Sequence, residues 1–305
     1  IMYTEFGTTY NSYILKAGDK TILFETAKAR FFDEFIERVN EITASTKIDY
    51  LVVNHTEPDH AGSVERLLEL NPGLKIIATG CAAGFLKEIV NRDFTVITVK
   101  DNETIKIADK TLRFLVVPNL HWPDTMYTYI EEEQILVTCD SFGSHYAFDD
   151  VLVSKVTDHE GYMRATKYYF DNILGPFKPY MKKALDRVRQ LDVTMICTGH
   201  GPVLDARLDF MMDTYEEWCR MPEQNPKKTV VIPYVSAYGF TKTLCEKITE
   251  GIQDSGDVLV RAYDMVESDA GKVLGEMAVA DGILLGSPTI LGEALKPIWD
   301  LTTQM

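Results

Sequence analysis

The chain has 305 residues, of which 46% are hydrophobic and 25% are charged, a composition typical of a folded globular protein and unlike a disordered or collagen-like chain. At ~150 residues per domain, this length predicts about two domains. The formal net charge of −15 argues against binding to nucleic acid or to an anionic membrane surface, because both are themselves negatively charged.

The sequence contains no apolar run near the ~20 residues that a membrane-spanning helix needs. Residues 1–7 lack the basic and apolar segments of a signal peptide. The five cysteines are scattered and form no C-x-x-C pair, which argues against a disulfide framework, a zinc ribbon or a cysteine-ligated iron–sulfur cluster. We therefore expect a cytoplasmic protein with reduced cysteines, in which Cys139 and Cys197 are small core residues.

The first two thirds of the chain alternate between strand and helix patterns. Short β-branched runs predict strands at 13–15, 21–24, 50–53, 75–78, 94–99, 112–117, 126–130, 134–138 and 193–197. Helical periodicity covers 31–41, 61–70, 84–91, 164–172, 180–190 and 205–219. The mixture of antiparallel and crossover connections predicts a layered α/β sandwich.

A second domain is predicted after a linker. Residues 221–228 are polar, contain two prolines and have no periodicity, as interdomain linkers do. Strands at 229–234, 258–262 and 282–286 then alternate with helices at 241–254, at 270–278 and from about Gly292. This βαβαβα order predicts a parallel, doubly wound sheet.

Several apolar strands of the first part lead directly into imidazole or carboxylate side chains. The candidate metal ligands that follow these strands are His55, Glu57, Asp59, His60, His121, Asp140 and His200. A single histidine or aspartate at a strand end is more often a hydrogen-bonded structural residue. The dense H-x-E-x-D-H cluster, together with four of the six histidines and three carboxylates placed after apolar strands, favours a dinuclear metal site instead.

The spacing suggests how the ligands divide. His55 and Glu57 are two residues apart in extended chain and can face one ion, whereas Asp59 and His60 follow the bend favoured by Pro58 and can face a second. One later histidine would join each ion, and Asp140 could bridge the two. An imidazole and carboxylate set without thiolate suits iron or manganese.

Other residues near this cluster are expected to lie outside the ligand set. His145 is a candidate for support of the ligands, and His159 is expected in a solvated loop. Trp122, Phe142 and Tyr146, together with His145, are candidates for lining the pocket.

The ligand pattern resembles the metallo-β-lactamase superfamily, and glutamate in place of its second histidine, here Glu57, resembles the flavodiiron proteins (A-type flavoproteins). The segments GTTYNSY, HWPDTM, CDSFG, YYFDNIL and GHGP, which begin at residues 7, 121, 139, 168 and 199, are similar to that family as well. The resemblance implies a metallo-β-lactamase-like αββα diiron domain over 1–220, the linker 221–228 and a flavodoxin-like FMN domain over 229–305.

By this resemblance, one iron is held by His55, Glu57 and His121. The other is held by Asp59, His60 and His200, with Asp140 as the bridge. The implied activity is reduction of O2 to water, of NO to N2O, or of both, and zinc cannot supply it because zinc does not change oxidation state. The implied electron donor to FMN is rubredoxin or a flavin reductase, and the implied assembly is a head-to-tail homodimer or a dimer of such dimers.

Two loops of the second domain resemble the FMN-binding loops of flavodoxins. The first opens a helix, where backbone N–H groups and the helix dipole favour a phosphate. The second lies at the carboxyl end of a later strand, where such sheets bind ligands. The candidate residues are Ser236, Ala237, Tyr238, Gly239, Phe240, Thr241, Ser287, Pro288, Thr289, Ile290, Leu291 and Gly292.

Only three β/α units are present where a flavodoxin-like sheet has five strands. We therefore expect the natural protein to continue past Met305, and the chain as given to hold FMN less tightly. Two other functions remain open at this point. A dinuclear metallohydrolase would act on an ester, thioester or phosphodiester, and a non-enzymatic redox or gas sensor would use the same metals to signal.

Overall fold

The computed structural model describes residues 2–43, 47–220 and 225–305. The chain divides into two compact units, Ile1–Arg220 and Met221–Met305. Residues 221–224 of the predicted linker lie outside the described residues.

The first sheet of the first unit is built by the N-terminal strands in the order β1-β2-β3-β4-β5. Strands β1 and β2 are antiparallel, and the later pairs are parallel. The bounds are β1 Tyr13–Ala17, β2 Lys20–Phe24, β3 Tyr50–Val52, β4 Lys75–Thr79 and β5 Thr95–Val99. The outer face packs on helices α1 Phe32–Thr43, α3 Val64–Leu70 and α4 Gly80–Ile89.

The second sheet has the order β10-β9-β8-β7-β6 and is antiparallel except for the pair β9 and β10. Its strands are β6 Thr104–Ile107, β7 Lys110–Val116, β8 Met126–Ile130, β9 Ile135–Cys139 and β10 Met195–Thr198. Helices α5 His159–Tyr169, α6 Lys178–Val188 and α7 Leu208–Trp218 cover its outer face. Shorter helical turns lie at Ala29–Phe31, Val153–Lys155, Phe170–Leu174 and Gly175–Phe177.

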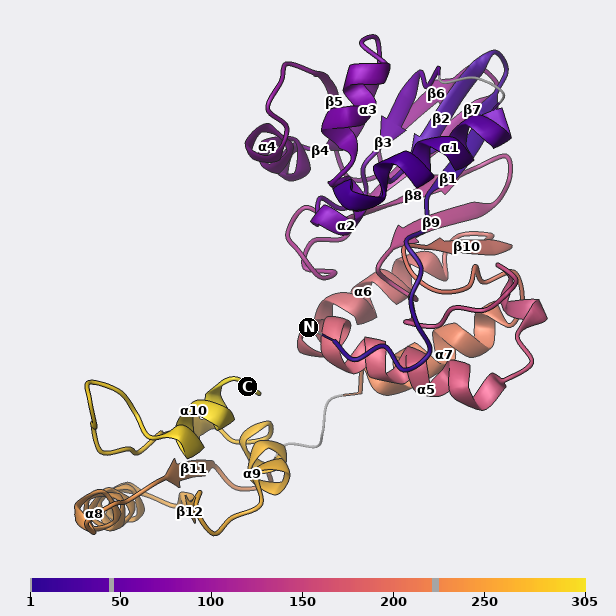
Figure 1. Cartoon of the computed structure of the whole chain (residues 1–305). Helices are drawn as coiled ribbons and strands as arrows, with labels where there is room; N and C mark the ends of the chain where they lie inside the picture. The colour runs from indigo at the N-terminus through magenta and orange to yellow at the C-terminus, as the bar shows by residue number, and fades with distance from the viewer. Residues whose placement is uncertain (1, 44–46, 221–224) are drawn as a thin grey trace. The chain divides into compact units, whose positions relative to one another are not determined.

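The inner faces of the two sheets share one apolar core. Ile22, Val52 and Ile77 of the first sheet pack with Phe114 and Val137 of the second. Helices α1, α3 and α4 therefore lie on one side of the unit and α5, α6 and α7 on the other, with both sheets between them (Figure 1). The predicted layered α/β sandwich is confirmed, and burial of alternate strand residues on both faces is its main stabilisation.

Two local predictions for the first unit are wrong. Strand β6 was not predicted: it pairs with β7 across a two-residue turn at Ala108 and Asp109, and its four residues are too short for a clear pattern. The predicted helix at 61–70 is interrupted, because α2 Pro58–Ala61 ends before α3 begins. Proline favours the first turn of a helix, so the predicted bend at Pro58 is the start of α2.

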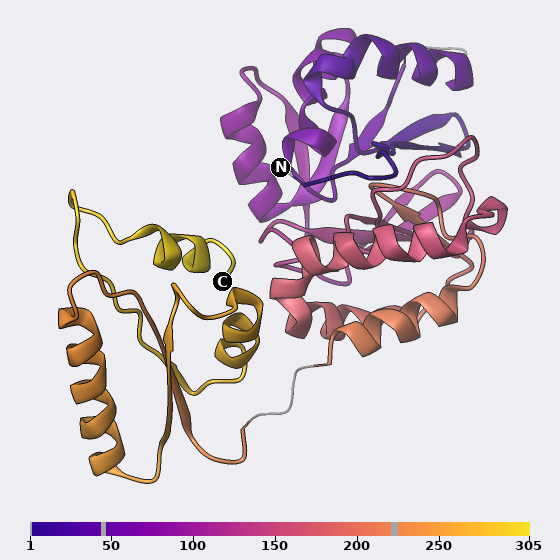
Figure 2. The same ribbon diagram turned by 60° about the horizontal axis from the view of Figure 1, so that its bottom comes forward.

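The second unit is a parallel three-stranded sheet with the order β12-β11-β13, as the βαβ alternation predicts. Its elements are β11 Thr229–Tyr234, α8 Phe240–Ser255, β12 Leu259–Asp264, α9 Ala270–Met277, β13 Gly282–Ile283 and α10 Lys296–Thr302. Helix α8 lies on one side of the sheet, and α9 and α10 lie on the other (Figure 2).

The end of this unit differs from the predicted pattern. Strand β13 is only two residues long, and the last helix begins at Lys296 instead of near Gly292. Leu291 and Gly292 both have positive φ angles, and Ile290 bridges to Glu293. This tight turn is incompatible with a helix, which starts only where Pro297 occupies its first turn.

No helix in the described ranges is long and apolar enough to cross a membrane. The five cysteines are free, and Cys139 and Cys197 are buried core residues as predicted.

Candidate metal centre and flavin loops

The seven predicted metal ligands lie in segments that follow strands of both sheets. His55 and Glu57 follow β3, and Asp59 and His60 lie in the adjoining helix α2. The remaining three follow strands of the second sheet: His121 after β7, Asp140 after β9 and His200 after β10. The fold thus brings together residues that are up to 145 positions apart in sequence, His55 and His200.

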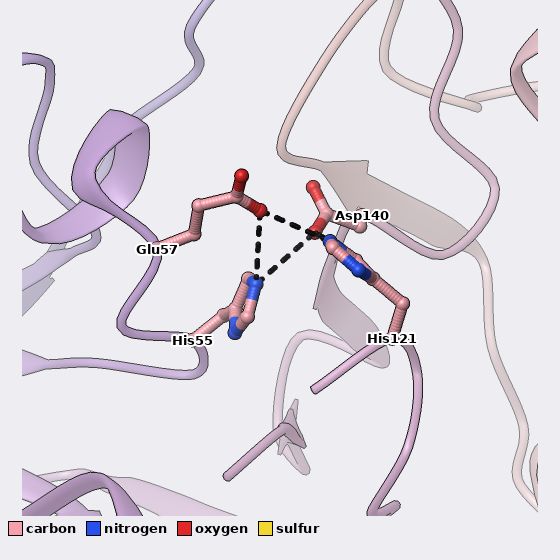
Figure 3. A group of neighbouring side chains, drawn as sticks. All are labelled: His55, Glu57, His121 and Asp140. Atoms are coloured by element: carbon pink, nitrogen blue, oxygen red, sulfur yellow. Dashed lines mark hydrogen bonds and ion pairs between the residues drawn. The ribbon is translucent and has the colours of Figure 1, made fainter. Parts of the chain in front are cut away.

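One group of four converges on a common point (Figure 3). Glu57 Oε2 lies 3.4 Å from His55 Nε2 and 3.0 Å from His121 Nε2. Asp140 Oδ2 lies 3.5 Å and 3.3 Å from the same two nitrogens. One possible ligand atom from each of the four residues lies within 4.8 Å of those of the others.

A second group faces the other oxygen of Asp140. Oδ1 of this carboxylate lies 3.1 Å from His60 Nε2 and 3.3 Å from His200 Nε2. Asp59 contributes Oδ1 at 3.6 Å from His60 Nε2 and Oδ2 at 3.5 Å from His200 Nε2. Asp140 therefore divides its two oxygens between two sets of nitrogen and oxygen atoms.

The side chains of these groups fit a pair of metal ions. In the described part of the chain, His55 Nε2, Asp59 Oδ1 and Asp140 Oδ2 are buried and have no hydrogen-bond partner. Such atoms are costly unless something satisfies them, and all three point into the two groups. Imidazole nitrogens and carboxylate oxygens without thiolate match iron, manganese or zinc.

The outward-facing nitrogens of two imidazoles are held by other residues. His55 Nδ1 lies 3.2 Å from the buried carboxylate of Asp124, which also accepts hydrogen bonds from Thr56. His200 Nδ1 lies 2.7 Å from the carbonyl oxygen of Thr9. Contacts of this kind fix the ring orientation of metal-binding histidines.

Sequence reasoning gave no role to Asp124, Thr9 or Tyr169, whose hydroxyl donates to Asp140 Oδ1 at 3.1 Å. All three lie in segments that resemble the flavodiiron proteins, at residues 7–13, 121–126 and 168–174. That resemblance was the available signal, but only the fold brings Asp124 to His55.

The charges of the site are strongly coupled. Burial disfavours the charged form of His55, but the neighbouring carboxylates of Asp124 and Glu57 outweigh it and raise its pKa to about 10. His121 is likewise buried, and contacts with Asp140 and Glu57 raise its pKa to about 9. The same contacts with His121 and His55 lower the pKa of Glu57 to about 2. Without a metal, protons on the imidazoles balance the carboxylates.

Some of the residues expected around the ligands lie beside them, and others do not. His145 lies beside His200 and Tyr169 and pairs with the hydroxyl of Thr8 at 2.8 Å. Burial, with His200 nearby, lowers the pKa of His145 to about 4, so its ring is neutral.

Trp122 packs edge-on against His55 and His121. Phe142 and Tyr146 instead belong to the core beneath the second sheet. His159 is exposed but begins helix α5.

The two predicted flavin loops lie side by side at the carboxyl edge of the three-stranded sheet in the second unit. Residues 236–241 follow β11 and 287–292 follow the segment that begins with β13. Tyr234 bridges to Gly286, and a Cβ added to Gly286 would lie 3.4 Å from Thr241. The two loops therefore begin next to each other.

The first flavin loop turns sharply into helix α8. Gly239 has a φ of 87°, a conformation that glycine adopts without strain. The first N–H groups of α8 have no partner within the helix, and side chains of the same loop, Tyr238 and Phe240, are 83% and 82% exposed. The loop thus combines backbone donors with accessible apolar surface.

Comparison with known proteins supports a single family. The profile of the ODP family beta lactamase matches residues 8–201. The flavo-diiron protein FprA2 of Clostridium acetobutylicum is 39% identical over 99% of this chain and 76% of its own length. The type A flavoprotein fprA of Rhodobacter capsulatus is 34% identical over 99% of the chain and 70% of its own length.

Solved structures agree. Rubredoxin oxygen:oxidoreductase from Desulfovibrio gigas matches with a TM-score of 0.70 and 29% identity, over 99% of this chain and 75% of that one. The flavodiiron protein of Giardia intestinalis matches with a TM-score of 0.71 and 28% identity, over 99% and 73%. The metallo-β-lactamase-like and flavodoxin-like folds are thereby confirmed, and the chain belongs to the flavodiiron (A-type flavoprotein) family.

Proposed function

We propose that this protein is an oxidoreductase that reduces O2 to water, NO to N2O, or both, at a pair of iron ions. In this proposal, residues 1–220 form the diiron domain, residues 221–228 are the linker and residues 229–305 belong to the FMN domain. The observation that carries it is the division of Asp140 between two groups of ligands, in a chain that also contains two loops suited to a flavin.

In this assignment one iron is held by His55, Glu57 and His121, and the other by Asp59, His60 and His200. Asp140 would be the ligand shared by the two ions, because its two oxygens face different groups. The buried unpaired atoms of His55, Asp59 and Asp140 support occupation by cations. Three carboxylates would balance most of the charge of two divalent ions.

The flavin assignment rests on the loop geometry. We propose that the N–H groups at the start of α8, with Ser236 and Thr241, bind the phosphate of FMN. Tyr238, Phe240 and Leu291 are exposed apolar side chains on the two loops, and they could cover the flavin ring. Neutral backbone donors allow phosphate binding in a chain of negative net charge.

The iron pair and reduced FMN would each supply two electrons, which meets the four-electron demand of O2, whereas coupling of two NO molecules needs only two.

The exposure of the ligand side chains indicates how substrate would reach the site. The side chains of four of the seven ligands are at most 4% exposed, namely His55, His60, Asp140 and His200. The Glu57 side chain is 35% exposed, and those of His121 and Asp59 are each 16% exposed. Substrate would therefore approach over Glu57, the most exposed ligand, which lies 3.0 Å from His121, a neighbour of the Trp122 ring.

We propose rubredoxin or a flavin reductase as the electron donor. We propose a head-to-tail homodimer, or a dimer of such dimers, as the assembly, so that the flavin of one subunit can serve the irons of another. Rubredoxin appears in the name of the Desulfovibrio gigas relative. The free cysteines support a reduced, cytoplasmic setting.

The test is metal analysis of the purified protein, together with anaerobic turnover after loading with iron and FMN. We expect two irons per chain and consumption of O2, NO or both. The metallohydrolase alternative predicts two zinc or manganese ions, no flavin and cleavage of a chromogenic ester. The sensor alternative predicts a full iron site with only slow turnover.

A further inference from the structure

One short segment carries four of the seven proposed metal ligands, and its middle is fixed by Asp124. The segment runs from Asn54 to His60. Thr56 donates to Asp124 from both its backbone nitrogen and its hydroxyl at 2.8 Å, and His55 Nδ1 faces the same carboxylate. We call residues 54–60 the ligand loop.

The two ends of the ligand loop form hydrogen bonds with Glu25 and Thr26, the two residues that follow strand β2. Glu25 Oε1 accepts a hydrogen bond from the backbone nitrogen of Asn54 at 2.7 Å. The next residue, Thr26, donates to the carbonyl oxygen of His60 from its backbone nitrogen at 2.7 Å and from its hydroxyl at 2.6 Å. Glu25 and Thr26 therefore fix the first and last residues of the ligand loop.

The second oxygen of Glu25 is not used by these contacts. Glu25 is 1% exposed, and its Oε2 is buried without a hydrogen-bond partner among the described residues. His60 also has a buried polar atom without a hydrogen-bond partner. Its Nε2 faces Asp59 and Asp140, while its Nδ1 is buried and also unpartnered in the described structure.

The side chains of Glu25 and His60 lie close together. A carboxylate oxygen of Glu25, a ring nitrogen of His60 and the sulfur of Cys139 lie within 4.8 Å of one another. When a metal binds Nε2 of an imidazole, the proton resides on Nδ1, which then needs an acceptor. Asp124 is placed to accept for His55 and the Thr9 carbonyl for His200.

We propose that Glu25 is a positioning residue of the metal centre, with one oxygen fixing Asn54 and the other receiving the Nδ1–H of metal-bound His60. This inference rests on the proposed metal centre and deepens it. Two buried carboxylates then serve the two groups separately: Asp124 orients His55 in one, and Glu25 orients His60 in the other.

A simpler role for Glu25 would be structural, limited to the hydrogen bond with Asn54. Glutamine separates the two roles. The amide oxygen of Glu25→Gln can still accept from Asn54, but the NH2 group then faces His60 and cannot accept a hydrogen bond. Glu25→Asp keeps a carboxylate on a side chain that is one methylene shorter, and Glu37→Gln makes the same change on the exposed surface of α1.

The test uses Co(II) in place of iron, with two measurements on the whole chain. Proton NMR follows the solvent-exchangeable imidazole N–H signals, which paramagnetic Co(II) moves out of the crowded region. Competition with a chelator gives the affinity of each Co(II) ion. Thermal unfolding of the metal-free variants identifies any that do not fold.

We expect Glu25→Gln to lose or shift one imidazole N–H signal. We also expect it to lower the affinity for one of the two Co(II) ions by about 10- to 100-fold. Asp124→Asn should alter a different N–H signal and lower the affinity for the other Co(II) ion. Glu25→Asp should still show a His60 N–H signal, moved in position because the carboxylate is one methylene further away, and Glu37→Gln should match the parent. If Glu25→Gln does not fold, Glu25→Asp must still shift the His60 signal without changing that of His55.

The proposal is overturned if Glu25→Gln keeps every N–H signal and both affinities. It is also overturned if Glu25→Gln lowers the affinity for both Co(II) ions equally, or if it alters the same N–H signal as Asp124→Asn. Co(II) binding requires neither flavin nor gas, so these results are independent of the reductase activity. A parent protein that binds no Co(II) would overturn both the positioning role and the proposed metal centre.

Discussion

Gly199 lies directly against the ring of His60, since a Cβ at position 199 would be 2.8 Å from His60 Cε1. The same Cβ would lie 3.1 Å from the carbonyl carbon of Cys139, the residue before Asp140. The His60 ring in helix α2 and the ends of β9 and β10, which lead to Asp140 and His200, are therefore packed so closely that only a hydrogen atom fits at position 199.

We predict that Gly199→Ala displaces His60 and weakens metal binding at the Asp59, His60 and His200 group. Overpacking of a buried site costs about 1–3 kcal/mol, so the melting temperature should also fall. The control is Gly84→Ala in helix α4, where an added Cβ has open space and alanine favours the helix. Equal metal content and stability in both variants would contradict the prediction.

Removal of Asp140, the proposed bridging carboxylate, should have the largest effect. Asp140 faces four imidazole nitrogens, so Asp140→Ala leaves both groups without their shared ligand. We expect loss of O2 and NO consumption by more than about 100-fold, beyond the effect of losing a supporting residue. Iron analysis of the reloaded variant should give fewer than two ions per chain. A variant that retains two irons and one of the activities would rule out the bridge.

Metal affinity should depend on pH over an unusual range. The pKa values of about 10 for His55 and about 9 for His121 mean that both rings carry protons at neutral pH in the metal-free protein. These protons must leave before Nε2 can bind a metal. The apparent affinity should therefore keep rising from pH 7 to 9, whereas ordinary histidines give a plateau above about pH 6.5.

Chelator competition with Zn(II) between pH 6 and 9.5 measures this dependence. A plateau that begins below pH 7.5 would contradict it. Asp124→Asn removes the carboxylate that faces His55 Nδ1. The Zn(II) affinity of this variant should therefore reach its plateau at a lower pH than that of the parent.

Tyr169 should act on the bridge through its hydroxyl. Burial raises the pKa of this phenol well above its usual value, so it stays a neutral donor to Asp140 Oδ1. Tyr169→Phe should keep two metals but change the reduction potential of the loaded protein, because Asp140 loses a hydrogen bond worth ~1–3 kcal/mol.

Tyr127→Phe is the matched control for the Tyr169 variant, since Tyr127 is also fully buried but donates to Ser141. Redox titration should separate the two variants. Identical potentials in Tyr169→Phe and the parent would refute this role.

The flavin loops depend on a close approach at Gly286. A Cβ there would lie 2.9 Å from Tyr234 Cβ and 3.4 Å from Thr241, so Gly286→Ala should push the two loops apart. We expect FMN affinity to fall by at least about tenfold, on the scale of 1–3 kcal/mol for overpacking. Quenching of FMN fluorescence measures it, with Gly275→Ala in α9, which has open space, as the control. Unchanged affinity in Gly286→Ala would argue against flavin binding between these loops.

The sequence predicted the elements that have strong local signals. Strands such as β8 and β11 are apolar runs with the bounds that the pattern predicts, and the ligands are recognisable because they follow such runs. Strand β6 was missed because its pairing with β7 stabilises a segment with a weak pattern.

Tertiary contacts explain the other omissions. Glu25 and Asp124 lie 29 and 69 residues from the backbone or side chain that they hold, and no local pattern marks such pairs. The helical placement of Asp59 and His60 depends on the packing of α2, whose residues His60 and Ala61 are buried.

The most direct test of the account is consumption of O2 and of NO, measured side by side with the iron- and FMN-loaded protein, with metal analysis of the same sample. We predict two irons per chain and turnover of at least one of the two gases, lost in Asp140→Ala. Two zinc ions per chain with ester cleavage and no consumption of either gas would contradict it.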